Sequence, residues 1–442
     1  MAQQQTGTFL DRFFGLTAKK TSVKTEIIAG LTTFIAMAYI IFVNPSILKD
    51  AGIPHEAAVA ATIWSAGICT IAMGLFANLP VAVAPGMGLN AFFAYYVCGT
   101  LGLPWQTALG AVFVSGIVFL ILTITKLRQH IIDSVPMSLK CAVVAGIGMF
   151  IAFVGLQGSG LVVANPATKV TIGDLSSAPV ALSAIGILII GVLLALHVKA
   201  AMLIGILVVA ILGMIFGAAP APTSISQVIS LDLPAFSETF LQMDVVGAVE
   251  YGLISVIFTF TVVELFDNIG TLIGVSKSAN LMDENGHIEN IDRALLTDSV
   301  GTMFSAVMGT CTVTSYVEST AGTNAGGRTG LTALTVGICF VLAVIFAPLA
   351  GLVPSFATAP ALIIVGAMMM KNVLNINFND YSDSIPAFLT ILMMPMTYSI
   401  ANGFGFGFTS FCLLKLLTGK YKEISPVMWV VTIVFIISFT MH

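Results

Sequence analysis

The sequence Val83-Ala84-Pro85-Gly86-Met87-Gly88-Leu89-Asn90 lies inside an apolar stretch that is otherwise long enough to cross a membrane. Proline removes a backbone hydrogen-bond donor and glycine disfavours the helix interior, so this sequence predicts a helix that is interrupted. A second stretch, residues 310–320, reads Thr-Cys-Thr-Val-Thr-Ser-Tyr-Val-Glu-Ser-Thr and contains few good helix formers. Both stretches therefore predict breaks in an otherwise helical chain.

The rest of the chain is strongly apolar. Of its 442 residues, 57% are hydrophobic and only 9% are charged, whereas about a quarter of an average soluble chain is charged. This composition excludes a soluble globular enzyme and is typical of a protein embedded in a bilayer. The net charge of −4 and the lack of a Lys/Arg run argue against nucleic acid as a partner. The six cysteines lie in apolar stretches without metal-ligand spacing, so we expect no metal site.

The chain contains about fourteen apolar segments that are suited to span a membrane, because a helix needs about 20 residues to cross the hydrocarbon. We predict them near 26–43, 56–77, 80–99, 104–125, 137–156, 179–196, 200–219, 247–275, 294–310, 311–326, 329–349, 357–371, 384–418 and 426–441. The segment 384–418 is too long for one ordinary span. It predicts either a single broken helix or a tight hairpin around Asn402-Gly403.

The positions of Lys and Arg predict the orientation in the membrane. The first 25 residues are polar and are interpreted as a cytoplasmic tail rather than a cleaved signal. Loops after even-numbered segments should then be basic. Eight residues fit this rule: Lys126, Arg128, Lys140, Lys199, Lys277, Arg293, Arg328 and Lys371. Together with the four basic residues of the tail, twelve of the 17 are predicted inside. Lys415, Lys420 and Lys422 do not fit a single span, so either 384–418 is a hairpin or the last two predicted segments are wrong.

The two interrupted stretches fall in the third and tenth predicted segments, about half a chain length apart. This placement is expected of two repeats of seven segments, and an odd number of segments gives the two repeats opposite orientations. A pair of interrupted segments at matching positions indicates a transporter binding site at the interface between the repeats.

Four carboxylic acids lie inside predicted segments, namely Glu264, Asp267, Asp298 and Glu318, and no Lys, Arg or His shares those segment interiors. A carboxylate in the middle of a bilayer is costly unless it is paired, neutralised or facing water, so each is a candidate functional residue. Without a cation nearby, neutralisation means protonation, which a proton-coupling site requires. All four are therefore proton-coupling candidates. For Asp298, a structural cap or an ion pair with Arg293 is the favoured alternative.

Several of these residues are also suited to hold a solute. Glu264 and Asp267 are three residues apart on one helix face, so one can bind a solute while the other carries a proton. Glu318 lies in the second interrupted stretch, and Asn90 ends the first with an amide that both donates and accepts. Nearby aromatic rings could cover a flat ring system. The predicted solute-binding set is Asp267, Glu318, Asn90, Glu264, Leu89, Ser319 and Phe260.

At these residues the sequence resembles the AzgA-type purine permeases, a branch of the nucleobase–ascorbate (nucleobase:cation symporter-2) transporters. Four stretches carry the resemblance, and the second includes the quoted sequence through Phe93. They are residues 25–34, beginning Thr-Glu-Ile-Ile-Ala-Gly; residues 78–93; residues 266–272, Phe-Asp-Asn-Ile-Gly-Thr-Leu; and residues 316–332, from Tyr-Val-Glu-Ser to Gly-Gly-Arg-Thr-Gly-Leu-Thr. The resemblance extends over essentially the whole chain.

The resemblance implies an all-α polytopic membrane protein with fourteen segments in two inverted repeats of seven, and short strands in segments 3 and 10. It also implies a core domain of segments 1–4 and 8–11 and a gate domain of segments 5–7 and 12–14. The corresponding ranges are 1–25 for the tail, 26–125 and 247–349 for the core, and 126–246 and 350–442 for the gate.

The resemblance further implies a function: proton-coupled import of adenine, guanine or hypoxanthine across the plasma membrane by alternating access, without a cofactor. The expected partners are a purine base, a proton and membrane lipid, and a homodimer is one assembly left open. Asp267 and Glu318 match the family's acidic substrate positions, and Asn90 matches its polar position in the third segment. Glu264 departs from adenine-selective relatives, where we expect Asn, and this weakens an adenine-only specificity.

Other classes of protein remain as alternatives. A channel should show charged rings along a pore, and an intramembrane enzyme should show a nucleophile and base or metal ligands. Neither pattern is present in the sequence. A carrier of another small planar or anionic solute, such as a uracil- or xanthine-like base or an exchanged anion, on the same fold is the closest alternative, although an anion site should include a basic group.

Overall fold

The computed structural model describes residues 9–230, 237–252, 254–283 and 287–441. Within these ranges, nine helices are long and apolar enough to cross a membrane by length and composition, and two shorter apolar helices accompany them. The chain is thus a polytopic, almost entirely helical membrane protein, as predicted. Residues 1–8 of the predicted tail lie outside the described ranges, and the described part of the tail contains a short helix.

The first half of the chain contains ten α-helices and the strands β1 to β3, and two of the helices continue into π-helical turns. Its elements are α1 (Phe9–Phe14), α2 (Val23–Met37), α3 (Ile40–Asp50), α4 (His55–Ala72), η1 (Met73–Ala77), β1 (Val83–Pro85), α5 (Met87–Ala91), η2 (Phe92–Thr100), α6 (Trp105–Ile124), α7 (Leu127–Ser134), α8 (Met137–Gly158), β2 (Val162–Asn165), β3 (Lys169–Ile172), α9 (Ala178–Ala195) and α10 (Ala201–Ile215).

The second half repeats the order of the long helices, again with one strand inside a broken segment, but the β2–β3 hairpin has no counterpart among its described residues. Its elements are η3 (Ile225–Gln227), α11 (Val245–Glu250), α12 (Ile254–Ser278), α13 (Ile291–Met308), β4 (Val313–Ser315), α14 (Ser319–Asn324), α15 (Gly330–Leu342), η4 (Ala343–Phe346), α16 (Ala347–Leu352), α17 (Ser355–Met369), η5 (Met370–Asn375), α18 (Tyr381–Met396), α19 (Ile400–Leu417), η6 (Tyr421–Glu423) and α20 (Pro426–Met441).

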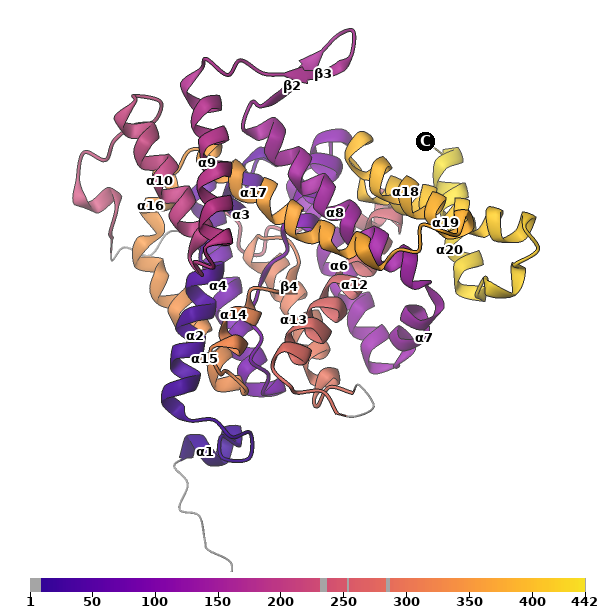
Figure 1. Ribbon diagram of the computed structural model, residues 1–442, viewed down its shortest axis with the longest axis horizontal. Helices are drawn as coiled ribbons and strands as arrows, with labels where there is room; N and C mark the ends of the chain where they lie inside the picture. The colour runs from indigo at the N-terminus through magenta and orange to yellow at the C-terminus, as the bar shows by residue number, and fades with distance from the viewer. Residues whose placement is uncertain (1–8, 231–236, 253, 284–286, 442) are drawn as a thin grey trace, which may run out of the picture.

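The two interrupted stretches meet in the middle of the molecule, where β4 lies among the surrounding helices (Figure 1). Strands β1 and β4 pair antiparallel, with Val83 opposite Ser315 and Pro85 opposite Val313. Gly86 is needed at this crossing because a Cβ atom there would approach the Thr314 hydroxyl to 2.8 Å. The short strands expected in segments 3 and 10 are therefore present, and each is followed by a short helix.

The helices pack in two sets. In one set, α2 and α4 pack on α15, and α6 packs on α12 and α13, around the crossed strands. In the other set, α8 packs on α17 and α18, α9 packs on α10 and α17, and α18 packs on α19. The contacts of α8–α10 are mirrored by those of α17–α19, as expected for repeated units. The residue numbers at which the two domains were predicted to divide stay predictions.

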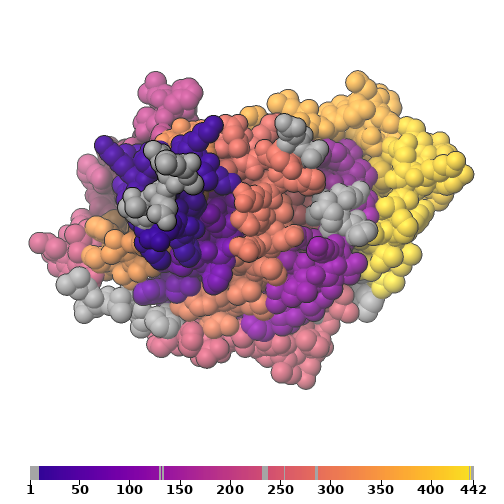
Figure 2. All heavy atoms as spheres, turned by 90° about the horizontal axis from the view of Figure 1, so that it is seen from below, coloured from indigo at the N-terminus to yellow at the C-terminus, as the bar shows by residue number. Residues whose placement is uncertain are grey.

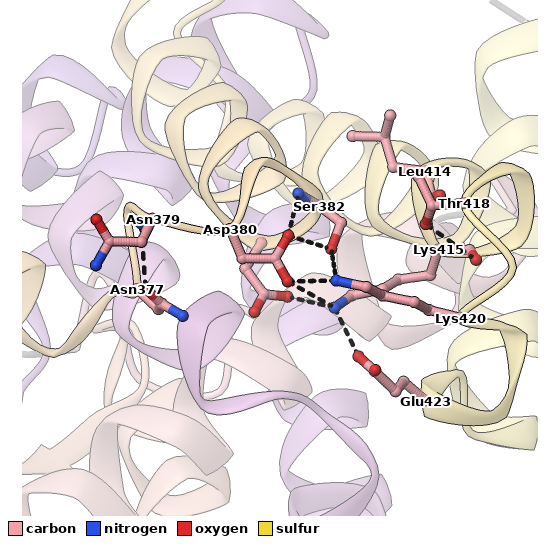
Figure 3. Close-up of polar contacts among 10 residues, drawn as sticks. Asn377, Asn379, Asp380, Ser382, Leu414, Lys415, Thr418, Lys420 and Glu423 are labelled. Carbon is pink, nitrogen blue, oxygen red and sulfur yellow. Dashed lines mark hydrogen bonds and ion pairs between the residues drawn. The ribbon is translucent and has the colours of Figure 1, made fainter.

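The end of the chain settles the alternative left open for 384–418. Helices α18 and α19 form a hairpin whose turn lies at residues 397–399, so Asn402-Gly403 lies inside α19 rather than in the turn. Lys420 Nζ lies 2.6 Å from Asp380 Oδ2, and the buried Lys415 Nζ lies 3.0 Å from Asp383 Oδ1, which ties the two helix ends together (Figure 3). The predicted single span is therefore wrong, the predicted hairpin is confirmed, and α20 follows as an additional apolar helix.

The N-terminal segment and loops after even-numbered segments lie together on the face that Figure 2 views, with N-terminal residues (indigo) on the left, central residues (salmon) in the middle and C-terminal residues (yellow) on the right. Three contacts join these loops, namely the ion pairs Lys19–Glu289 and Arg128–Asp292 and a hydrogen bond from Ser425 Oγ to Ser134 O at 3.0 Å. Loops after odd-numbered segments meet at the opposite end, where His55 Nε2 lies 3.3 Å from Ala350 O. Because α18 and α19 form a hairpin, Lys420 and Lys422 follow its second helix and fit the predicted pattern of basic loops after even-numbered segments.

Candidate solute-binding site

The site is built where the crossed strands end. Gly86 N donates to Thr312 O at 2.9 Å, and Tyr316 N donates to Ala82 O at 2.9 Å, so each strand is held at both ends. The Tyr316 hydroxyl also donates to Pro85 O at 2.6 Å. Because the pairing is antiparallel, α5 and α14 leave the crossing at opposite ends. The backbone groups and side chains at these ends converge on the four acids of α12, α13 and the β4–α14 segment.

Ser319, predicted as a solute ligand, has a structural contact in this arrangement. Its hydroxyl oxygen accepts a hydrogen bond from Ala82 N at 3.0 Å, and the side chain is fully buried. The contact crosses from the start of α14 to the residue before β1. Ser319 therefore holds the two interrupted segments together.

Asp267 and Glu318 are the two of the four acids that are only partly buried. The Tyr39 hydroxyl donates to Glu318 Oε1 at 2.6 Å. Tyr39 is fully buried and occupies the break between α2 and α3. Asp267 lies beside the Thr314 hydroxyl of β4. The structure thus brings these two predicted residues to the strand crossing from different helices.

Glu264 and Asp298 lie deeper, with exposed fractions of 0% and 1%. Glu264 accepts a hydrogen bond from the Thr302 hydroxyl, and Asp298 Oδ2 accepts one from Ser315 Oγ at 3.2 Å. The second oxygen of each acid has no partner among the described residues. The alternative of an ion pair between Asp298 and Arg293 is not borne out, because no ion pair within the described ranges includes any of the four acids.

The predicted ligands of α5 and α12 are buried in the same region. Asn90 is fully buried and donates through Nδ2 to Asn44 Oδ1. Leu89, beside it, is 2% exposed. Phe260 is fully buried, and its ring meets Phe92 edge-on with centroids 5.2 Å apart. These side chains surround the crossing, and the aromatic rings contact each other.

Sequence reasoning missed three polar residues that contact the predicted ones, Tyr39, Asn44 and Thr302, and a fourth, Asn268, that contacts β4. Asn268 Oδ1 accepts from Ser315 N at 2.6 Å, which fixes the end of β4 to α12. Asn44 falls one residue beyond the predicted end of the first segment, whereas α3 continues to Asp50. The sequence signal that could have revealed Asn44 is an asparagine directly before Pro45 at the end of an apolar run. For Tyr39 and Thr302 no local pattern distinguishes them from other residues of apolar helices.

Two inverted repeats with crossed half-segments and unpaired acids at the crossing define the chain as a secondary membrane transporter. The fold agrees with that of the transmembrane domain of the cyanobacterial bicarbonate transporter BicA, with a TM-score of 0.65 over 86% of this chain and 97% of that one at 17% identity. Residues 24–406 match the model described as the permease family, and the chain belongs to this family.

Named relatives support this assignment over the full length. The adenine permease AdeQ of Escherichia coli K12 is 45% identical over 98% of this chain and 96% of its own length. The guanine/hypoxanthine permease PbuG of Bacillus subtilis is 46% identical over 97% of this chain and 98% of its own. The predicted resemblance is thereby confirmed, and the protein is a multi-pass membrane permease rather than an enzyme.

Proposed function

We propose that the protein is a proton-coupled symporter that imports purine nucleobases. The observation that carries this proposal is the group of four acids at the crossed strands, each of which has a hydroxyl partner but no cation partner among the described residues. Relatives of nearly equal similarity are an adenine permease and a guanine/hypoxanthine permease, which supports a purine as the solute.

The chemistry of a purine suits these residues. A purine presents ring N–H donors and acceptor nitrogens along its edge and flat faces on either side. Asp267 and Glu318 supply acceptors, Asn90 supplies an amide, and Phe260 lies among rings that can cover a face. Each buried polar pairing that a wrong solute fails to make costs about 1–3 kcal/mol. Adenine, guanine and hypoxanthine are therefore the solutes to compare.

Coupling to protons follows from the two environments of the acids. Asp267 and Glu318 are half-buried and can exchange a proton with water, whereas Glu264 and Asp298 are enclosed. A negative charge in this region without a cation is costly, so the loaded carrier is favoured when proton and solute bind together. Binding of one then strengthens binding of the other, and a proton gradient drives uptake.

Alternating access would come from movement of the two helix sets against each other about the crossing. We place the protein in the plasma membrane with the basic face, which carries the N-terminal segment and the loops after segments 4 and 8, in the cytoplasm. The predicted core and gate domains are the two bodies that would move.

The test replaces Glu318 by Gln and measures uptake of labelled hypoxanthine, adenine and guanine between about pH 5 and about pH 8. We expect Glu318→Gln to lose the pH dependence of uptake, since the amide keeps the shape of the carboxyl group but cannot exchange a proton. We also expect it to weaken purine binding by about tenfold, because the purine loses a carboxylate as a hydrogen-bond partner. Glu56→Gln, at an exposed helix start, is the matched control. Unchanged affinity together with unchanged pH dependence would remove Glu318 from the mechanism.

Competition identifies the solute. Unlabelled adenine, guanine, xanthine and uracil, each added against labelled hypoxanthine, should separate a purine carrier from a carrier of other planar bases. Strong competition by uracil or xanthine with none by adenine and guanine would favour the alternative solute class on the same fold. Bicarbonate and sulfate in the same assay test for an anion carrier.

A further inference from the structure

Asn44 lies at the centre of a buried chain of side-chain hydrogen bonds that ends at Asn90. Its Nδ2 donates to Thr62 Oγ1 at 2.7 Å and to Thr310 Oγ1 at 3.0 Å, while its Oδ1 accepts from Asn90 Nδ2. Asn44, Thr62, Thr310 and Asn90 are all fully buried. They come from α3, α4, the residues before β4, and α5, so the chain links four separate parts of the core.

One backbone group fixes the direction of every bond in this chain. The Thr62 hydroxyl donates its single hydrogen to Ala58 O at 2.6 Å, and a carbonyl oxygen can only accept. The Thr62 oxygen is therefore left to accept from Asn44, which must present its NH₂ group to it. The carbonyl oxygen of Asn44 then faces Asn90, and Asn90 must present its own NH₂ group in return. An amide whose two ends are normally hard to tell apart is thereby oriented.

The consequence lies at the other end of Asn90. Its Oδ1 is buried and has no partner among the described residues. Asn268 shows the opposite arrangement: Ser315 N can only donate, so Asn268 Oδ1 accepts, and Asn268 Nδ2 is the atom without a described partner. Backbone groups thus fix the polarity of both buried amides near the crossing, with an acceptor available on Asn90 and a donor on Asn268.

We infer that Asn44 is a positioning residue that presents Asn90 to the solute as a hydrogen-bond acceptor, so that the solute must place a ring N–H against α5. This inference rests on the proposed role of Asn90 in purine binding. A freely rotating amide would match either a donor or an acceptor on the solute. With the amide oriented, a solute that places an acceptor atom against Asn90 Oδ1 brings two lone pairs together, so such a solute binds less tightly.

The test uses Thr62, which acts on Asn90 only through Asn44. Thr62→Val keeps the side-chain shape but removes the hydroxyl that orients Asn44. We expect the purine concentration for half-maximal uptake to rise about tenfold, with the maximal rate per transporter unchanged. We call the hydrogen-bond chain from Thr62 through Asn44 to Asn90 the relay. In an Asn90→Ala background, Thr62→Val should not raise the half-maximal concentration further, because Thr62 acts on the solute only through Asn90. Thr62→Ser retains the hydroxyl and should restore the wild-type value.

Thr123→Val is the matched control. Thr123 is also a buried threonine of a core helix, α6, but its hydroxyl has no partner among the described residues. The same substitution there should leave both the half-maximal concentration and the maximal rate unchanged. The relay is contradicted if Thr62→Val has the same effect with and without Asn90, or if it lowers only the maximal rate, since either result describes a structural role.

A second readout separates failure of the relay from failure of the proposed function. If the wild-type protein takes up no purine, the proposed function fails. The relay is then tested by thermal unfolding of the purified protein, where Thr62→Val and Asn90→Ala should be non-additive and Thr123→Val and Asn90→Ala additive. Additive effects of Thr62→Val and Asn90→Ala would overturn the relay independently of transport.

Discussion

The acidic cluster at the crossed strands and the ion-pair cluster at the end of the α18–α19 hairpin treat charge in opposite ways. In the hairpin cluster, the Lys415 side chain is 2% exposed (Figure 3). Its Nζ lies 2.6 Å from Glu423 Oε2, 3.0 Å from Asp383 Oδ1 and 4.0 Å from Asp380 Oδ2. At the crossed strands, by contrast, the acids have hydroxyl partners and no ion pair within the described ranges.

From this difference we propose that the acids of the hairpin cluster serve stability and that those at the crossed strands serve function. A buried lysine surrounded by carboxylates is stable as long as its partners remain, and removing one member leaves a charge without compensation. An acid with no cation has no such partner to lose, and its charge can instead be balanced by a proton that arrives with a solute. Substitutions in the two clusters should therefore affect different measurements.

The largest effect is expected at the acidic cluster. Asp267→Asn removes a carboxylate that we propose contacts both proton and purine, and uptake should fall about 100-fold, which corresponds to the loss of one strong buried polar interaction. The melting temperature in detergent should stay close to the wild-type value, because the amide retains the size of the carboxyl group. A comparable fall in melting temperature would mean that Asp267 is structural, like the acids of the hairpin.

Lys415→Met should show the opposite pattern. It removes the cation from Asp383 and Glu423, and because both acids are partly exposed, the expected loss in free energy of unfolding is about 1–3 kcal/mol. The purine concentration for half-maximal uptake should not change. Lys422→Met is the control, since Lys422 is exposed on the same loop. If Lys415→Met raises the half-maximal concentration without lowering stability, the contrast between the two clusters is wrong.

The smallest effect is a pH dependence confined to the hairpin cluster. Hydrogen bonds from Lys420 and from the hydroxyl and backbone of Ser382 hold the pKa of Asp380 below its ordinary value. A carboxyl group whose pKa is lower in the folded protein than in the unfolded chain stabilises the fold at pH values above its pKa in the unfolded chain, which is near ~4. This contribution is lost as the pH falls toward and through its pKa in the folded protein.

Asp380→Asn keeps a side-chain oxygen for the start of α18 but cannot titrate. The melting temperature of this variant should therefore fall less than that of the wild type when the pH is lowered from about 5 to about 3. Identical slopes for the two proteins would show that Asp380 contributes nothing to the acid sensitivity of the fold.

Much of the fold was predictable because its signals are local. Pro85 and Gly86 interrupt an apolar stretch, the β-branched residues around Val313 interrupt another, and both predicted breaks contain the strands that the family resemblance implies. The isolation of Glu264 and Asp267 from any cation was also visible in the sequence. These features depend on residue types within a few positions of one another.

The unpredicted features depend on contacts between distant residues. Tyr39 and Glu318 are 279 positions apart, and Asn44 and Thr310 are 266 apart, so no local periodicity reveals either pair. The turn of the hairpin was misplaced because Asn402-Gly403 has a typical turn composition, yet Gly403 and Gly407 are needed inside α19. A Cβ atom at either residue would collide with α18, at Met394 or Thr390.

The most direct test of the account is the movement of protons with purine through the purified protein in liposomes. With hypoxanthine, adenine or guanine added outside, the account predicts acidification of the lumen by the wild-type protein and no acidification by Glu318→Gln. Purine that enters to the same level, with no change in lumenal pH and no response to collapse of the pH gradient, would contradict it.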